Sequence, residues 1–133
     1  MGRLNDRVAI VTGGGRGIGQ ATSLRLAADG AAVVVNDIDD APADETIALI
    51  EAAGGKAIKC VANTVDMEQA KALIATTIDA FGKIDIVVNN AGVTRDKMFH
   101  GLDDEQFDFV FDANLKTGFH TTLAAMPYLR EVA

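Results

Sequence analysis

The sequence predicts an α/β domain built around a doubly wound parallel sheet of about four strands. Short apolar runs recur along the chain, and after each run apolar residues return at helical spacing. These runs occupy residues 7–12, 32–36, 57–62 and 84–88. An unbroken apolar run is typical of a strand buried on both faces, and alternating strand and helix units form a parallel sheet. Right-handed crossovers then give the expected strand order 3-2-1-4.

The first strand leads directly into a glycine-rich turn and a helix. Residues 10–19 read IVTGGGRGIG. In this pattern Gly13 suits a tight turn, Gly17 leaves room for a phosphate close to the backbone, and Gly19 allows the helix to pack against its strand. The helix is expected over residues 17–29, with a glycine immediately after it as its stop. Its positive N-terminal end predicts a site for the phosphates of a nucleotide.

Asp37 directly follows the second strand, 18 residues after Gly19. An acid at about this distance is typical of a carboxylate that accepts hydrogen bonds from an adenosine ribose. It would repel a 2′-phosphate, which favours NAD over NADP. Arg16 is counter-evidence, because an arginine in the turn could reach that phosphate, although it could also hold the pyrophosphate or point into water. Asp39 and Asp40 are interpreted as helix caps in a solvated loop.

Two further units have clear helix boundaries. The second helix is expected from about residue 41, with its end at Gly54–Gly55. The third begins with Asp66 and Gln69 at capping-box spacing and ends at Phe81–Gly82. The fourth strand is followed by the sequence Asn-Asn-Ala-Gly at residues 89–92, whose small residues would let the backbone approach a ligand.

The last predicted helix covers residues 103–131 and begins with Asp103 and Gln106 at capping-box spacing. Its apolar stripe consists of Phe107, Val110, Phe111, Leu115, Gly118, Phe119 and Thr122, and Asn114 falls within it. The stripe predicts either core or a surface for a partner helix. An asparagine buried among phenylalanines would need a partner from the backbone, from water or from a ligand.

Composition narrows the classes of partner. The 133 residues suit one domain, and 49% of them are hydrophobic. The net charge of −7 argues against nucleic acid and against an anionic membrane surface as partners.

Cys60 is the only cysteine and is expected to be a buried, inert thiol, so no metal site is predicted. His100 and His120 are interpreted as non-catalytic. Without an 18-residue apolar run, a cytoplasmic protein is expected.

These motifs together resemble the short-chain dehydrogenase/reductase family. Its T-G-x-x-x-G-x-G turn is matched by Thr12, Gly13, Gly17 and Gly19, and its N-N-A-G motif is matched at residues 89–92. Residues 94–96, Thr-Arg-Asp, resemble the following segment in the 3-oxoacyl-carrier-protein reductase branch. The resemblance implies a Rossmann-type domain of an NAD(P)-dependent oxidoreductase that acts on a 3-oxoacyl, 3-hydroxyacyl or similar substrate.

The resemblance also assigns residues to the site. Asn114 occupies the position of the family's catalytic asparagine, which lies at a helix irregularity and holds a water. Asn63 is expected at the adenine edge, unless it is an ordinary residue of the turn after the strand. The residues expected to bind the cofactor are Thr12, Gly13, Gly15, Arg16, Gly17, Ile18, Gly19, Asp37, Ile38, Asn63, Thr64, Asn90, Ala91 and Gly92.

The family's other catalytic groups, a serine and a Tyr-x-x-x-Lys pair, have no counterpart here. The only serine is Ser23 in the first helix, and the only tyrosine, Tyr128, has Val132 four residues later. Residues 1–133 are therefore expected to be the N-terminal, dinucleotide-binding portion of the domain, inactive alone. The alternatives are an inactive nucleotide-binding or interaction fragment, a homo-oligomer that pairs through the 103–131 helix, and a separate chain that supplies the C-terminal half.

Overall fold

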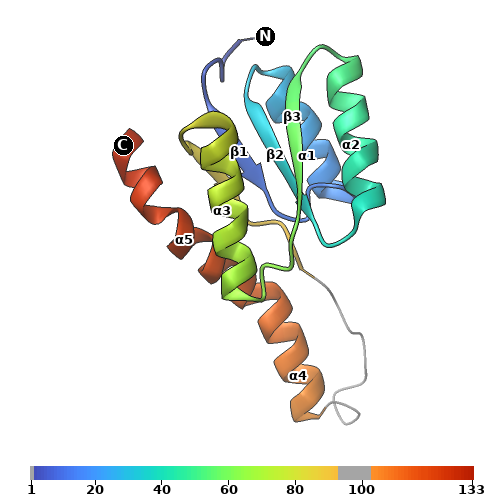
Figure 1. The fold of residues 1–133 in the computed structure, drawn as a ribbon. Coiled ribbons are helices and arrows are strands. Elements are labelled where there is room, and N and C mark those ends of the chain that lie inside the picture. Colours follow the sequence, from blue (N-terminus) through green and yellow to red (C-terminus); the bar gives the residue numbers. More distant parts are fainter. Residues whose placement is uncertain (1, 93–102) are drawn as a thin grey trace.

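The computed structural model describes residues 2–92 and 103–133, and it has a four-stranded parallel sheet at its centre (Figure 1). The strands are β1 (Val8–Val11), β2 (Ala32–Asp37), β3 (Lys56–Val61) and β4 (Ile86–Val88). Their order is β3-β2-β1-β4, which confirms the predicted topology. Residues 94–96 and His100, which entered the sequence analysis, lie outside the described residues.

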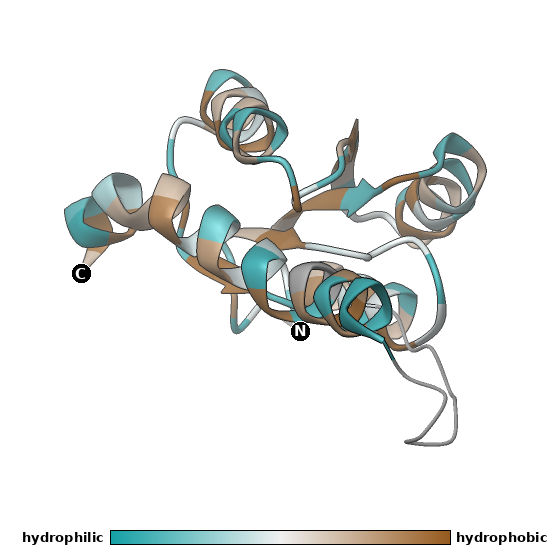
Figure 2. Ribbon diagram, turned by 90° about the horizontal axis from the view of Figure 1, so that it is seen from below, coloured by the Kyte–Doolittle hydropathy of each residue, from teal (hydrophilic) through white to brown (hydrophobic). Residues whose placement is uncertain are grey.

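Helices cover both faces of the sheet, as Figure 2 shows from below. The helices α1 (Gly17–Ala28) and α2 (Asp40–Ala52) pack on one face. On the other face lie α3 (Met67–Phe81) and α5 (Thr117–Val132). This arrangement explains why β1 and the first four residues of β2 are apolar: successive side chains point to opposite faces, and each face has its own layer of helices.

The two helical layers give the domain two hydrophobic clusters, one on each side of the sheet. Val11 and Val35 point toward α1 and α2, whereas Ile10 and Val34 point toward α3 and α5. All four side chains have no exposed surface. Cys60 is only partly buried, and burial raises the pKa of its thiol above the ordinary value, which keeps the thiol protonated at neutral pH.

The ends of α3 match their sequence signals. The Asp66 carboxylate accepts a hydrogen bond from the amide of Glu68 at 3.1 Å, as expected of an N-cap residue. Gln69 departs from the capping box, because its side-chain oxygen accepts from the amide of Asn63 at 2.7 Å. Gly82 ends the helix in the left-handed conformation, with a φ of 78°.

The fourth strand is shorter than predicted, and the Asp85 carboxylate just before it ties β4 to β1. One carboxylate oxygen accepts a hydrogen bond from the Val8 amide at 2.8 Å, and ion pairs run to Arg7 and Lys83 at 3.2 Å each. Burial raises the pKa of this carboxyl, but hydrogen bonds from Val8, Lys83 and Arg7 outweigh burial and leave the pKa below its ordinary value. Asp85 is therefore ionised at neutral pH and holds two strands that are distant in sequence.

Replacing Asp85 by asparagine is expected to lower the free energy of unfolding by about 1–3 kcal/mol at pH 7, because hydrogen bonds to a charged acceptor are lost. Since the pKa is lowered in the folded state, the stabilisation is complete above the ordinary value of 3.8 and disappears as the pH falls through the lowered pKa. Urea unfolding at pH 7 and at acid pH measures both effects. Asp79→Asn, on the exposed side of α3, is the matched control, and equal losses in the two variants would contradict the prediction.

The segment from α4 (Asp104–Phe111) through the π-helical turn η2 (Asp112–Lys116) to α5 contradicts one expectation. The predicted stripe does not form core: Phe107, Leu115 and Phe119 are 63%, 56% and 62% exposed. The buried residues of α5 are Thr117, Thr121 and Ala125. Small side chains allow close packing of α5 against α3, so the helix buries its less hydrophobic face. The stripe's alternative role, a surface for a partner helix, stays a prediction.

Candidate functional site

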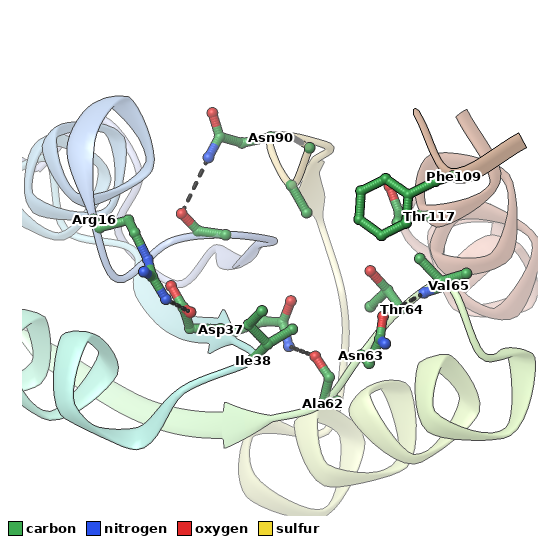
Figure 3. Close-up of a pocket in the computed structure, with 14 residues that line it drawn as sticks. Arg16, Asp37, Ile38, Ala62, Asn63, Thr64, Val65, Asn90, Phe109 and Thr117 are labelled. Carbon is green, nitrogen blue, oxygen red and sulfur yellow. Dashed lines mark hydrogen bonds and ion pairs between the residues drawn. The ribbon is translucent and has the colours of Figure 1, made fainter. Parts of the chain in front are cut away.

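A cavity of about 500 Å³ opens where the carboxyl ends of the strands meet the loops that follow them (Figure 3). This is the edge at which doubly wound sheets bind ligands. The lining residues come from the glycine turn, the loops after β2, β3 and β4, and the segment around α4 and α5. They are Gly13, Arg16, Asn36, Asp37, Ile38, Ala62, Asn63, Thr64, Val65, Asn90, Ala91, Gly92, Phe109 and Thr117.

Two glycines of the turn have conformations that favour glycine. Gly13 has a φ of 61°, and a Cβ there would lie 3.0 Å from Cα of Ala91. Gly17 has a φ of 56°, and a Cβ there would meet nothing within 4 Å. Arg16, the N-cap residue of α1, makes no side-chain cap hydrogen bond. The start of α1 therefore presents its positive end and open space together, which suits a diphosphate.

Gly19 and Asn90 join the glycine turn to the segment after β4. A Cβ on Gly19 would overlap the carbonyl oxygen of Gly13 and would lie 2.8 Å from its carbonyl carbon. The same carbonyl accepts a hydrogen bond from Nδ2 of Asn90 at 3.1 Å. Gly19 therefore permits close packing as predicted, but the partner is the turn rather than the strand.

Thr12 holds the part of the cavity wall that is formed by Asn90 and Ala91. Its hydroxyl oxygen accepts hydrogen bonds from the amides of Asn90 and Ala91, each at 3.0 Å, and the hydroxyl donates to the carbonyl of Val88 at 3.3 Å. Thr12 is 1% exposed and is not among the lining residues. Its contribution to the site is therefore to fix the backbone of the Asn90–Ala91 segment.

Asp37, the last residue of β2, has its carboxylate in the cavity wall, where it is 3% exposed. One oxygen accepts from the Gly15 amide at 3.3 Å, and the other accepts from the Asp39 amide at 3.2 Å and from Nη2 of Arg16 at 2.7 Å. Burial raises the pKa of Asp37, but the hydrogen bonds from Arg16 and the backbone outweigh burial, so the pKa lies below its ordinary value. The carboxylate is ionised at neutral pH and is available as an acceptor.

Arg16 does not point into water: one guanidinium nitrogen contacts Asp37 and also Asp39, each at 2.7 Å. Hydrogen bonds to Asp37 and then Asp39 raise the pKa of Arg16 above its ordinary value. Asp39 was expected to cap α2, and this is wrong: it is the N-cap residue but makes no side-chain cap hydrogen bond. Its carboxylate is used by Arg16, which competes with the helix amides for the same oxygens.

The loop after β3 forms the opposite wall. The Asn36 side chain fixes this loop, since its Nδ2 donates to the carbonyls of Cys60 at 3.0 Å and Ala62 at 3.1 Å. The Asn63 side-chain oxygen accepts from the Val65 amide at 3.1 Å and is exposed, which leaves a lone pair for a ligand. Nδ1 of His120 on α5 lies 3.2 Å from the carbonyl oxygen of Thr64. His120 therefore couples α5 to the loop, a role that the sequence did not indicate.

Asn114 lies in η2, so the helix irregularity that the resemblance implied is confirmed. Its Nδ2 donates to the carbonyl of Val110 at 2.8 Å, and its Oδ1 would overlap a Cβ on Gly92. The expectation of a buried asparagine is wrong, because Asn114 is exposed. It lies against the Gly92 end of the cavity without being among the lining residues.

Sequence reasoning thus identified most of the cavity and missed part of it. Five of the residues predicted to bind the cofactor are not in the lining: Thr12, Gly15, Gly17, Ile18 and Gly19. Five lining residues were not predicted: Asn36, Ala62, Val65, Phe109 and Thr117. Asn36 could have been found as the polar residue within an apolar strand. Phe109 and Thr117 carried no local signal, because only the tertiary packing of α4 and α5 brings them to the cavity (Figure 3).

Residues 2–92 and 103–133 meet neither the requirements of a metal site nor those of a membrane-spanning helix. This part of the chain contains no group of three or more metal-ligating side chains. Nor does any of its helices combine the length and the apolar character needed to cross a membrane.

Known proteins share this sequence and this arrangement. A model of the family described as short chain dehydrogenase matches residues 7–133. The chain is 47% identical over 122 residues to the peroxisomal hydratase-dehydrogenase-epimerase of Neurospora crassa, a match that covers 92% of this chain and 13% of that protein. It is 46% identical over 125 residues to the 3-oxoacyl-[acyl-carrier-protein] reductase of Synechocystis sp., a match that covers 93% of this chain and 51% of that protein. A short chain dehydrogenase from Mycobacterium paratuberculosis, crystallised bound to NAD, superposes with a TM-score of 0.92 at 33% identity, over 98% of this chain and 53% of that one.

The chain spans about half the length of the last two relatives and a smaller share of the first. The sheet order, the glycine turn and the Asn90–Gly92 segment all fall within the matched residues. On the family match, the chain belongs to the short chain dehydrogenase family.

Proposed function

We propose that this chain is the dinucleotide-binding part of an NAD(P)-dependent oxidoreductase. One observation carries the proposal: the glycine turn, the Asp37 carboxylate and the Asn90–Gly92 segment converge on a single cavity at the carboxyl edge of the sheet. Family membership supports it, as does the structurally similar protein from Mycobacterium paratuberculosis, which was crystallised bound to NAD.

The residues present fit a dinucleotide. The open space at Gly17 and the positive end of α1 suit the pyrophosphate, and Asp37 suits the hydroxyls of the adenosine ribose. Ile38 and Asn63 would flank the adenine, with the Asn63 oxygen accepting from its amino group. When bound, the nicotinamide of such a cofactor supplies hydride transfer.

The preferred cofactor is NAD. A 2′-phosphate next to the Asp37 carboxylate would place like charges together in a partly buried site, whereas a free 2′-hydroxyl can donate a hydrogen bond to it. Both oxygens of this carboxylate already accept backbone amides, so its position is fixed before a ligand arrives.

The substrate of the whole protein is proposed to be a 3-oxoacyl or 3-hydroxyacyl compound, or a similar carbonyl or alcohol, free or attached to an acyl carrier. The names of the Synechocystis and Neurospora proteins support this class. Asn114 is proposed as the one catalytic residue in this chain, acting through a held water. The alternative function is that of a catalytically inactive fragment that binds a nucleotide or interacts with another protein. Its partner would be a second copy of this chain or a separate chain. We also propose a cytoplasmic location.

Asp37→Asn is expected to weaken NADH binding by about 10- to 100-fold, because the ribose loses a charged acceptor. Three of the acceptor positions of Asp37 are already used by Gly15, Asp39 and Arg16, so the loss concerns the remaining one. The NADPH affinity should fall less, since the repulsion of the 2′-phosphate is removed at the same time. Isothermal titration with both cofactors measures the change, and thermal unfolding shows whether the variant is folded. Asp40→Asn makes the same chemical change on an exposed residue that pairs with Lys59. Wild-type protein that binds neither cofactor would refute the proposed function.

A further inference from the structure

Arg16 and Asp37, two residues of the cavity lining, form a charged cluster with Asp39, which is not in the lining (Figure 3 shows Arg16 and Asp37). Nη2 of Arg16 lies 2.7 Å from an Asp37 oxygen and 2.7 Å from an Asp39 oxygen. The three side chains differ in burial, since Asp37 is 3% exposed, Arg16 is 56% exposed and Asp39 is 59% exposed. One cation therefore bridges a buried carboxylate and an exposed one.

Asp39 is fixed in this bridge by the backbone as well as by its side chain. Its amide donates to the Asp37 carboxylate at 3.2 Å, so the turn between the two acids is closed. Its side chain makes no cap hydrogen bond to α2, although it is the N-cap residue. The adjacent Asp40 contacts Lys59 instead, at 2.8 Å. Of these two neighbouring acids, only Asp39 is directed at the cavity arginine.

This placement affects which anion the cavity can accept. A 2′-phosphate on the ribose would need a free guanidinium to offset its charge. Arg16 is the arginine of the cavity lining, and two carboxylates already share it, so the cluster has a net charge of −1. Nη2 of Arg16 contacts both carboxylates, so a phosphate that recruits this guanidinium must compete with both of them for its positive charge, and the exposed Asp39 adds to that competition.

We propose that Asp39 is a specificity-determining residue: it holds Arg16 against Asp37, withholds the guanidinium from a 2′-phosphate, and thereby makes the site select a dinucleotide with a free 2′-hydroxyl. Asp39 acts through Arg16, so it is a positioning residue. This inference rests on the proposed function, because it concerns the same dinucleotide site.

The test is the ratio of the NADH and NADPH affinities, measured by isothermal titration at low salt. Asp39→Asn is expected to shift this ratio toward NADPH by about five- to tenfold, the effect of removing one partly screened charge and freeing the arginine. Asp39→Glu retains the charge and should keep the wild-type ratio. Asp40→Asn, an identical change on the next residue, should leave the ratio unchanged. A merely structural role for Asp39 would alter both affinities together.

A double-mutant cycle separates positioning of the arginine from a simple charge effect. In an Arg16→Ala background, Asp39→Asn should change the ratio much less, because only the loss of the Asp39 charge remains and there is no guanidinium left to release. The inference is overturned if Asp39→Asn changes the ratio no more than Asp40→Asn, or if the full shift persists without Arg16. NADH binding with an unchanged ratio refutes this inference alone, whereas wild-type protein that binds neither cofactor refutes the proposed function and this inference with it.

Discussion

Gly19→Ala is expected to abolish measurable NADH binding and to lower the free energy of unfolding by about 3 kcal/mol, the upper end for overpacking. The added Cβ would overlap the carbonyl oxygen of Gly13 and would lie 2.8 Å from its carbonyl carbon. Both are backbone atoms, so they cannot yield by a change of rotamer. The overlap can be relieved only by moving the start of α1 or the Gly13 turn, and either movement distorts the proposed phosphate site.

Gly118→Ala provides the control, because a Cβ there would lie 3.5 Å from its nearest neighbour, an ordinary contact. This glycine lies inside α5, where alanine should be neutral or stabilising by up to about 1 kcal/mol. Urea unfolding and isothermal titration with NADH should therefore separate the two variants clearly. A Gly19→Ala protein as stable as Gly118→Ala, with wild-type affinity, would show that the turn relaxes without affecting the site.

The sequence predicted the sheet and its ligand-binding edge because their signals are local. Unbroken apolar runs identify β1 and β2 without any knowledge of the tertiary structure. Parallel strand and helix units with right-handed crossovers then allow few strand orders. The positions of Gly13 and Asp37 then follow, since each comes at the carboxyl end of a strand, and those ends meet at one edge. Nine of the fourteen lining residues were predicted, some from these signals and others, such as Asn63 and the Asn90–Gly92 segment, from the family resemblance.

The missed features depend on contacts between distant residues. Arg16 and Asp39 are 23 positions apart, and the sequence shows that they are charged but not that their side chains contact each other. The apolar stripe of the last helix misled in a different way. A helix with apolar residues on more than one side does not reveal which side is buried, and here the small residues Thr121 and Ala125 pack inward while Phe119 is exposed.

The same distinction explains why Thr12 was assigned to cofactor binding although its structural role is support. A motif position indicates that a residue matters to the turn, but not whether it touches a ligand. The hydroxyl of Thr12 makes three hydrogen bonds, two as acceptor and one as donor, and these use its whole capacity. Its value to the site therefore lies in the Asn90–Ala91 backbone, and this interpretation can be tested by removing the hydroxyl alone.

Thr12→Val is expected to lower the free energy of unfolding by about 2–4 kcal/mol. Valine has nearly the shape of threonine, so packing is retained, but the amide of Ala91 loses its acceptor at a site where Thr12 is 1% exposed, whereas the amide of Asn90 keeps the carbonyl of Val88 at 3.1 Å. A buried donor left without a partner costs about 1–3 kcal/mol, and the lost hydrogen bond from the Thr12 hydroxyl to Val88 adds about 1 kcal/mol. NADH binding should weaken as well, because the cavity wall would shift to find another partner for the Ala91 amide.

Thr12→Ser separates the hydroxyl from the methyl group, since it keeps the three hydrogen bonds and loses only one buried carbon, at a cost of about 1 kcal/mol. The expected order of stability in urea unfolding is wild type, then serine, then valine, and NADH titration should follow the same order. If valine were as stable as serine, the Ala91 amide would have to find another acceptor at no cost, and the support of the Asn90–Ala91 wall would then come from packing rather than from the Thr12 hydroxyl.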